Sequence, residues 1–260
     1  DTTTSGPTES WGGDADTDTD TDTDQAGVLE WVAVYGDTLF MGSPDGEGAD
    51  NEHPEHAVQV PPFEMLSAEV SVVQYTACVE AGPCTEPGAG EQCNWGLTDR
   101  LSHPVNCVDF AQAEVFCEHA GGRLPSEAEW ELVASNGWDV DYPWGDETAS
   151  CDRAVMSDPL AGGSGCGDGS TKRICDRPAG DTAHGICDMA GNVAEWVVDH
   201  YHPTYDGAPT DGGAWTDLDG SQRVLKGGGF DDGGFGLRAA ARVPANALDQ
   251  GATIGFRCVR

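Results

Sequence analysis

The stretch GICDMAGNVAEW, residues 185–196, decides the fold of this chain. It places two carboxylates, Asp188 and Glu195, on either side of a glycine and ahead of a tryptophan. A tight bend, which glycine permits, would gather these side chains with the backbone carbonyls of Gly191 and Val193. Carboxylate and carbonyl oxygens are the ligands that Ca²⁺ prefers, so the stretch predicts a calcium site made of these four residues.

The same residues have a simpler interpretation, which the sequence leaves open. Asp188 could cap a turn, and Glu195 could pair with an arginine from elsewhere in the fold. In that case the stretch would be structural and would hold no metal.

Charge is distributed unevenly along the 260 residues. The formal net charge is −34, and the first 99 residues contain 21 acidic side chains and no lysine or arginine. Such a surface repels nucleic acid and anionic lipid, so we exclude both as partners. It suits solubility and divalent cations, and a halophilic origin would explain it as well.

Residues 1–26 are predicted to form a disordered acidic tail. They contain the run TDTDTDTD and little apolar surface apart from Trp11, so folding could not offset the loss of chain entropy. A tail of this kind could tether a domain to a membrane anchor, and the start at Asp1 is expected of a mature or trimmed chain. We assign residues 27–260 to one folded domain. No apolar run of about 18 residues occurs, so no transmembrane span is expected.

Ten cysteines form an even set without any CxxC pair, which argues against a zinc ribbon or a thioredoxin-type site. Disulfides formed in an oxidising compartment are the better interpretation, and they predict an extracytoplasmic protein that is secreted, periplasmic or a surface lipoprotein. Ten free thiols buried in a core are the alternative. Four cysteines are expected to pair among themselves: Cys78, Cys84, Cys93 and Cys107.

Short strands are predicted near both ends of the domain, and helices between them. Strands are expected at 28–35, 38–43, 223–230, 237–244 and 254–260, and a pair of strands broken by Pro61 and Pro62 is expected within 56–70. Three helices should begin at a capping residue followed by glutamine or glutamate three positions later. These pairs are Ser71 with Gln74, Asp109 with Gln112, and Ser126 with Glu129. Residues 137–222 show little periodicity, so metal ions or disulfides should organise them.

Several separated blocks together resemble one family. They are FMGS (40–43), SVVQY (71–75), GGRLPSEAEWELVA (121–134), YPWGD (142–146), GNVAEW (191–196), RVLKGGGF (223–230) and GFRC (255–258). Their order and spacing are similar to those of the sulfatase-modifying-factor domain, which includes the formylglycine-generating enzymes. The resemblance implies an α+β fold similar to C-type lectins, low in regular structure and stabilised by disulfides and calcium.

The resemblance also implies which activity is missing. Formylglycine-generating enzymes oxidise a substrate cysteine with copper bound by two enzyme thiols that follow a GGS motif. The corresponding run here, residues 227–242, contains no cysteine, and thiolates are the soft ligands that hold Cu(I). Gly229 replaces the serine of GGS, and Ala194 replaces the first tryptophan of the family's WEW. We therefore expect no formylglycine-generating activity and predict no catalytic residue, although other enzymatic activity stays open.

Further sites follow from the resemblance alone. A family disulfide implies a bond between Cys117 and Cys258, whereas the positions of a second family disulfide are Ala134 and Ala239 here. The family's first calcium set maps onto the four residues of the opening stretch. A second calcium site would use the carboxylates of Asp152 and Asp168 in the 150–170 loop.

The remaining polar candidates have competing interpretations. His53 with His56, or His200 with His202, could hold a transition metal, but loop histidines without a third ligand are favoured. The arginines of the family pattern more often pair with buried carboxylates than bind a substrate. They are Arg123, Arg238, Arg242 and Arg257. Asp231 and Asp232 could be a binding feature or a solvated turn.

The sequence thus predicts a calcium-stabilised, monomeric binding or accessory module for an unknown protein, peptide or small-molecule ligand. The alternative is an oxidoreductase or maturation enzyme that acts on a peptide or small substrate in the same cleft.

Overall fold

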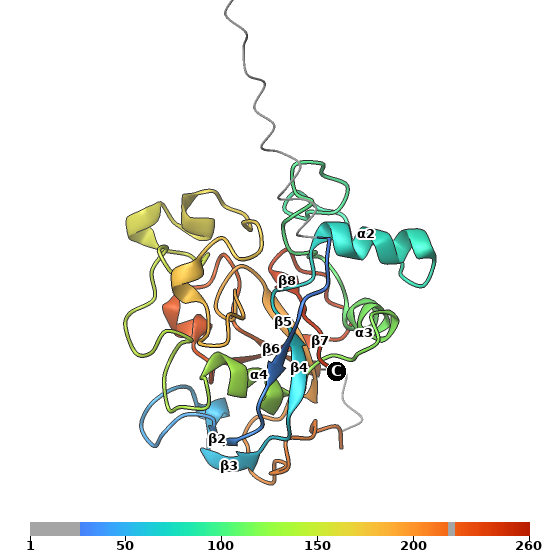
Figure 1. The fold of residues 1–260 in the computed structure, drawn as a ribbon. Coiled ribbons are helices and arrows are strands. Elements are labelled where there is room, and N and C mark those ends of the chain that lie inside the picture. Colours follow the sequence, from blue (N-terminus) through green and yellow to red (C-terminus); the bar gives the residue numbers. More distant parts are fainter. Residues whose placement is uncertain (1–26, 218–221) are drawn as a thin grey trace, which may run out of the picture.

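The computed structural model describes residues 27–217 and 222–260 (Figure 1). The predicted acidic tail, residues 1–26, lies outside the described residues. The described chain is a mixed α+β domain with little regular secondary structure. None of its helices exceeds ten residues, so none is long enough to cross a bilayer.

Eight short strands form three small sheets in the described part of the chain. They are β1 (Trp31–Val34), β2 (Thr38–Met41), β3 (His56–Gln59), β4 (Phe63–Leu66), β5 (Ala194–His200), β6 (Gln222–Lys226), β7 (Arg242–Asn246) and β8 (Ile254–Gly255). β1 pairs with β4 and β2 with β3, both antiparallel. The third sheet has the order β7-β6-β5-β8, in which only β5 and β8 run parallel.

The strand predictions near the termini are confirmed in part. The predicted strand at 237–244 is wrong over most of its length, because β7 begins only at Arg242. A 3-10 helix, Gly234–Leu237, and a turn occupy the residues before it. LRAAARVP contains alternating apolar residues because its turn is buried. A two-residue apolar period therefore does not distinguish such a turn from a strand.

All three predicted helices begin at the predicted capping residues. They are α2 (Val72–Ala81), α3 (Phe110–His119) and α4 (Glu127–Ala134). In each, the cap side chain accepts from the N3 amide and the N3 side chain accepts from the cap amide. α2 packs on α3, whereas α4 packs against β2, β5 and β6 near the centre of the molecule (Figure 1).

Residues 137–217 have little regular structure, as predicted, but they contain one strand that was missed. β5 crosses the centre of the largest sheet and buries Trp196 completely. Three short 3-10 helices also lie in this segment, Pro159–Ala161, Ser164–Gly167 and Pro178–Gly180, and a further one is Asp50–Glu52.

Five disulfides bond all ten cysteines of the chain. They are Cys78–Cys84, Cys93–Cys107, Cys117–Cys258, Cys151–Cys166 and Cys175–Cys187. The first two are the pairing expected among the four early cysteines, and the third is the pairing that the resemblance implies. This pattern indicates an oxidising, extracytoplasmic environment.

Candidate metal centre and binding cleft

The signature stretch forms the tight bend that its glycine permits. Gly191 has a φ of +85°, and a Cβ there would lie 2.5 Å from the carbonyl oxygen of Val155. Asp188 and Asn192 also adopt left-handed conformations, with φ of 54° and 63°. The bend turns the chain into β5, so that Asp188, Val193 and Glu195 are all buried.

Glu195 lies at the centre of a buried network. Its carboxylate accepts from Nε and Nη2 of Arg257 at 2.7–3.0 Å and from Nε1 of Trp130 at 2.8 Å. Arg257 also donates to the carbonyl oxygens of Cys187 and Asp188. Glu195 therefore does pair with an arginine, and that same arginine fixes the signature bend.

A third buried carboxylate, Glu69, was missed by the sequence analysis. It accepts from the side-chain amide of Asn192 at 2.7 Å and from the backbone amide of Val193 at 3.1 Å. Burial, together with the nearby Asp188 and Glu195, raises its pKa well above the ordinary value. The available signal was an acidic residue inside the apolar run SAEVSVV, where a carboxylate needs a partner.

Asp188 contributes its carboxylate to the same cluster. Its Oδ2 accepts from the backbone amide of Cys175 at 2.5 Å, and burial raises its pKa to about 6. The sulfurs of Cys175 and Cys187 also lie close to this carboxylate, but they are bonded to each other and are not thiolate ligands.

The residues present suit a calcium ion in charge and donor type, but the structure does not gather their carboxylate oxygens at one point. Among the described residues, the group of three potential side-chain ligands within 4.8 Å of one another is Cys175, Cys187 and Asp188, without Glu69 or Glu195. The carboxylates of Glu69, Asp188 and Glu195 are all buried, and Arg257 hydrogen-bonds that of Glu195. A buried excess of negative charge is costly unless a cation or protons neutralise it. Carboxylate and carbonyl oxygens suit Ca²⁺, and the calcium assignment stays a prediction.

The second predicted calcium pair lies at the surface. Asp152 follows Cys151 and Asp168 comes shortly after Cys166, so the disulfide joins their two segments in one loop. Both side chains are exposed, and Asp168 forms an ion pair with Lys172. This arrangement also stays a prediction.

The four arginines of the family pattern all pair with carboxylates, as the sequence analysis favoured. The pairs are Arg123–Glu129, Arg238–Glu52, Arg242–Glu127 and Arg257–Glu195. Lys226 of β6 reaches two carboxylates of α4, since its Nζ lies 3.8 Å from Oε1 of Glu127 and 2.7 Å from Oε2 of Glu131. Together with the Arg242–Glu127 pair, it holds α4 against the sheet.

The candidate histidines are divided between strand ends and loops: His56 begins β3 and His200 ends β5, whereas His53 and His202 lie in loops. His53 Nε2 lies 2.9 Å from the carbonyl oxygen of Glu47. His202 stacks on Trp215 and lies 2.9 Å from a carboxylate oxygen of Asp217. Within residues 27–217 and 222–260, no group of three potential metal ligands includes a histidine.

The run that corresponds to the family's copper site lines a separate cleft. Its cavity has a volume of about 260 Å³, and its lining includes Ala194, Gly227 and Gly228. Gly229 borders the same site, where a Cβ would lie 2.7 Å from the Cβ of Thr253. A serine at position 229 would thus clash unless Thr253 moved.

Carboxylates mark the rim of this cleft. Asp232 and Asp249 both line it, and each accepts from a backbone amide, Gly229 in one case and Asn246 in the other. Asp231 lies beside Asp232 and is largely exposed. Its partial burial and the negative charge of Asp232 raise the pKa of its carboxyl group. Asp232 therefore stabilises a turn, whereas the exposed side chain of Asp231 could contact a ligand.

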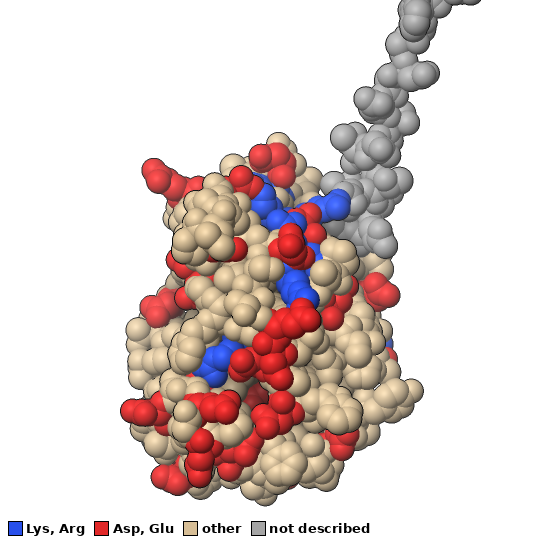
Figure 2. Space-filling view, turned by 90° about the vertical axis from the view of Figure 1, so that its left-hand side faces the viewer, with Lys and Arg blue, Asp and Glu red and all other residues tan. Residues whose placement is uncertain are grey.

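Acidic side chains dominate the face shown in Figure 2, where lysines and arginines form only a few small groups. Such a face repels polyanions, and the absence of a nucleic-acid partner stays a prediction.

Fold, disulfide pattern and buried ion pairs together define a domain of the formylglycine-generating-enzyme type. The chain belongs to the Sulfatase-modifying factor enzyme 1-like domain family, which matches residues 17–260. It is 30% identical to the formylglycine-generating enzyme of Streptomyces coelicolor, over 87% of this chain and 88% of that protein. The formylglycine-generating enzyme of Thermomonospora curvata is likewise 30% identical, over 87% and 92% of the two chains.

Solved structures show the same fold. The structure of PvdO from Pseudomonas aeruginosa matches with a TM-score of 0.77 and 26% identity, over 89% of this chain and 94% of that one. Treponema denticola variable protein 1 matches with a TM-score of 0.67 at 20% identity, which shows the fold alone. The family resemblance drawn from the sequence is confirmed.

Proposed function

We propose that this domain is a binding or accessory module that keeps the scaffold of the formylglycine-generating enzymes without their copper centre. The state of the cysteines carries the proposal, since all ten form disulfides and residues 227–242 contain none. Cu(I) needs soft thiolate ligands, which the carboxylates of Asp231 and Asp232 cannot replace.

The lining of the cleft supports binding. Small and apolar residues, among them Ala194, Leu225 and Ile254, form its walls. An alanine at position 194, where the family pattern has tryptophan, leaves room for a ligand group. Apolar walls with a few fixed polar groups are the usual composition of ligand sites. The ligand is a protein, a peptide or a small molecule that inserts an apolar group beside the aspartates.

An oxidoreductase or maturation enzyme acting on a peptide or small substrate is the second candidate. The convergence of Asp232 and Asp249 on one cavity favours it, because a carboxylate can act as a general base. The residues that line the cleft include no histidine or cysteine, however, and both carboxylates already accept from backbone amides. Binding therefore has the stronger support.

Calcium is the proposed cofactor, and its role would be structural. The buried carboxylates behind the signature bend support this, as does the scarcity of regular structure in residues 137–217. Calcium on a C-type-lectin-like scaffold would hold loops that present a ligand site. We further propose a monomer that is secreted, periplasmic or a surface lipoprotein, with residues 1–26 as the tether in the last case.

The absence of formylglycine chemistry can be tested directly. The purified protein is incubated with copper and a peptide that carries the CxPxR sequence, beside the Streptomyces coelicolor enzyme as a positive control. Mass spectrometry should find the peptide cysteine unchanged with this protein and converted with the control. Formylglycine in the first reaction would overturn the proposal.

A further inference from the structure

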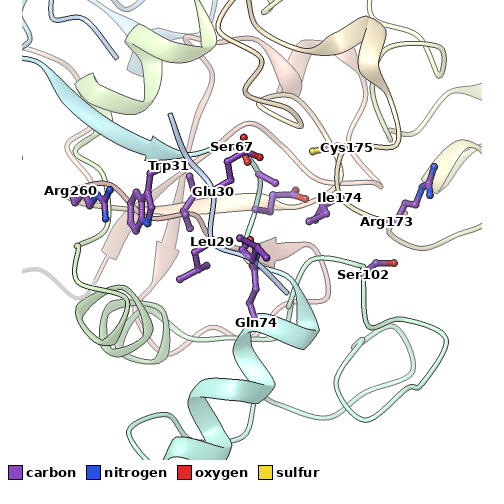
Figure 3. Close-up of a pocket in the computed structure, with 14 residues that line it drawn as sticks. Leu29, Glu30, Trp31, Ser67, Gln74, Ser102, Arg173, Ile174, Cys175 and Arg260 are labelled. Carbon is purple, nitrogen blue, oxygen red and sulfur yellow. The ribbon is translucent and has the colours of Figure 1, made fainter. Parts of the chain in front are cut away.

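One of the five disulfides has an exposed cysteine. Cys175 is exposed and lines a cavity of about 740 Å³ that shares no lining residue with the cleft (Figure 3). Its partner Cys187 is buried, and each of the other eight cysteines is buried or half-buried. Exposed disulfides are reduced more easily than buried ones, because a thiolate can reach a sulfur atom. We therefore expect reduction of this protein to begin at Cys175–Cys187.

A carboxylate lies beside this disulfide. A carboxylate oxygen of Asp188 and the sulfurs of Cys175 and Cys187 all lie within 4.8 Å of one another. The α-carbons of the two cysteines are 5.2 Å apart. Cysteine sulfur and aspartate oxygen are both ligands that Zn²⁺ takes, and three protein ligands with one water complete its tetrahedral shell. Water can reach this position from the cavity that Cys175 lines.

Hydrogen bonds hold these groups together without the sulfur–sulfur bond. The backbone amide of Cys175 donates to Oδ2 of Asp188 at 2.5 Å, and that of Cys187 donates to the carbonyl oxygen of Ser67 at 2.9 Å. Arg257 donates to the carbonyl oxygens of Cys187 and Asp188, at 2.9 and 3.3 Å. The backbone should therefore keep both thiols beside the carboxylate after reduction, while side-chain rotation separates the sulfurs.

We infer that reduction of the Cys175–Cys187 disulfide creates a Zn²⁺ site, with two thiolates and the Asp188 carboxylate as its protein ligands. A dithiol reductant supplies two electrons and two protons, so that its own sulfurs become a disulfide and the two cysteines become thiols. Zinc then replaces the two thiol protons, which pass to solvent. Zinc binding thus depends on the redox state. The site lies apart from the cleft and does not rest on the proposed function.

Stepwise reduction of the purified protein tests the first step. Dithiothreitol is added in increasing amounts without air, free thiols are alkylated, and peptide mapping assigns each modified cysteine. Cys175 and Cys187 should be modified at lower dithiothreitol concentrations than Cys117 and Cys258, whose disulfide is fully buried. Equal or later modification of Cys175 and Cys187 would overturn the inference.

Co²⁺, a coloured substitute for zinc, tests the metal site. After selective reduction, the dithiol is removed and the protein is kept in calcium-free buffer, so that calcium does not occupy Asp188. The reduced protein should bind a single Co²⁺ with sulfur-to-cobalt charge-transfer absorption, and added Zn²⁺, which is d¹⁰, should abolish that absorption. The oxidised protein should show none. A reduced protein without this absorption contradicts the site, and so does an oxidised protein that has it.

The carboxylate ligand is tested by substitution. Asp188→Asn should weaken Co²⁺ binding by the reduced protein at least about tenfold, since even changes outside the ligand set of a metal site cost that much. Asp176→Asn, next to Cys175 in the sequence but outside the group of three, is its matched control and should leave binding unchanged. Equal affinity in the two variants would remove Asp188 from the site. Melting curves establish that each variant is folded.

The two thiols are tested in the same way. Cys175→Ala with Cys187→Ala should abolish the absorption, whereas Cys151→Ala with Cys166→Ala removes a different disulfide and should retain it. Alkylation of the selectively reduced wild-type protein blocks the same two thiols without a substitution, so the test does not depend on the folding of the double variant. Charge-transfer absorption that survives this alkylation would overturn the inference.

Discussion

The signature bend, residues 185–196, and the glycine run, residues 227–242, lie side by side. In the sheet, Glu195 of β5 lies opposite Lys226 of β6, the residue directly before the run. Buried charged groups fix the bend: Glu195, Arg257 and Glu69 are each buried and hydrogen-bonded within the protein. The middle of the run, residues 231–236, carries its acidic groups at the surface, whereas Arg238 and Arg242 at its end form buried ion pairs. Substitutions in the bend should therefore cost more stability than substitutions in the middle of the run.

This difference predicts that the fold tolerates substitutions in the exposed part of the run better than substitutions in the bend. Removing one partner of a fully buried ion pair strongly destabilises the folded state, whereas an exposed ion pair contributes little to stability. The four predictions that follow test this contrast, in order of decreasing effect.

Removal of Arg257 should give the largest loss of stability. Arg257→Met leaves the buried carboxylate of Glu195 without its counter-charge, which costs about 3–5 kcal/mol. The control is Arg260→Gln, which removes an ion pair whose side chains, Arg260 and Glu64, are 44% and 43% exposed, and it should cost less than about 1 kcal/mol. Denaturation by urea with the disulfides intact measures both. Equal losses in the two variants would break the contrast between buried and exposed charge.

Local sequence signals predicted more of this molecule than long-range ones did. The three capping boxes involve residues three positions apart, so the sequence contains both partners side by side. The pairing of arginines with carboxylates was predicted in kind, but the partners of Arg238 and Arg242 lie 186 and 115 positions away. No local pattern specifies which carboxylate each arginine meets.

The candidate site shows the same limit. The signature stretch identified Asp188 and Glu195, but Glu69 lies 124 positions before the amide of Val193 that it accepts from. β5 was missed because its residues follow a bend within a long irregular segment. Tertiary packing, not periodicity, makes that segment a strand.

The pH dependence of stability tests the buried end of β5. Asp199 accepts from the amides of Glu127 and Trp215, both at 2.7 Å, and burial raises its pKa from 3.8 to about 7. The folded state then binds this proton more tightly than the unfolded state. Its contribution to stability is therefore full below about pH 4 and is lost as the pH rises towards 7.

Comparison with Asp199→Asn isolates this contribution from the other carboxylates. The difference in unfolding free energy between wild type and variant should change by a few kcal/mol at most between pH 4 and pH 8, in favour of the wild type at low pH. A difference that stays constant over this range would show that Asp199 titrates normally. Urea denaturation at each pH provides the values.

Calcium removal should affect the bend and leave the glycine run unchanged. Excess EGTA should lower the melting temperature by several degrees, because a ligand bound only by the folded state stabilises it. Asp188→Asn, which removes one negative charge from the predicted ligand set, should shrink this shift. An unchanged melting curve in EGTA would contradict the calcium prediction, and metal analysis of the purified protein would identify any other bound ion.

The smallest effect is expected where the run departs from the family pattern. Gly229→Ser restores the family residue, but its Cβ would lie 2.7 Å from the Cβ of Thr253, so overpacking should cost about 1–3 kcal/mol. Thr253→Gly removes that Cβ, so the double variant should recover part of the loss, while the carbonyl oxygen of residue 253 stays 3.1 Å from the added Cβ. A double-mutant cycle by urea denaturation measures the coupling between the two sites. Strong coupling is expected from this contact, and additive effects would contradict it.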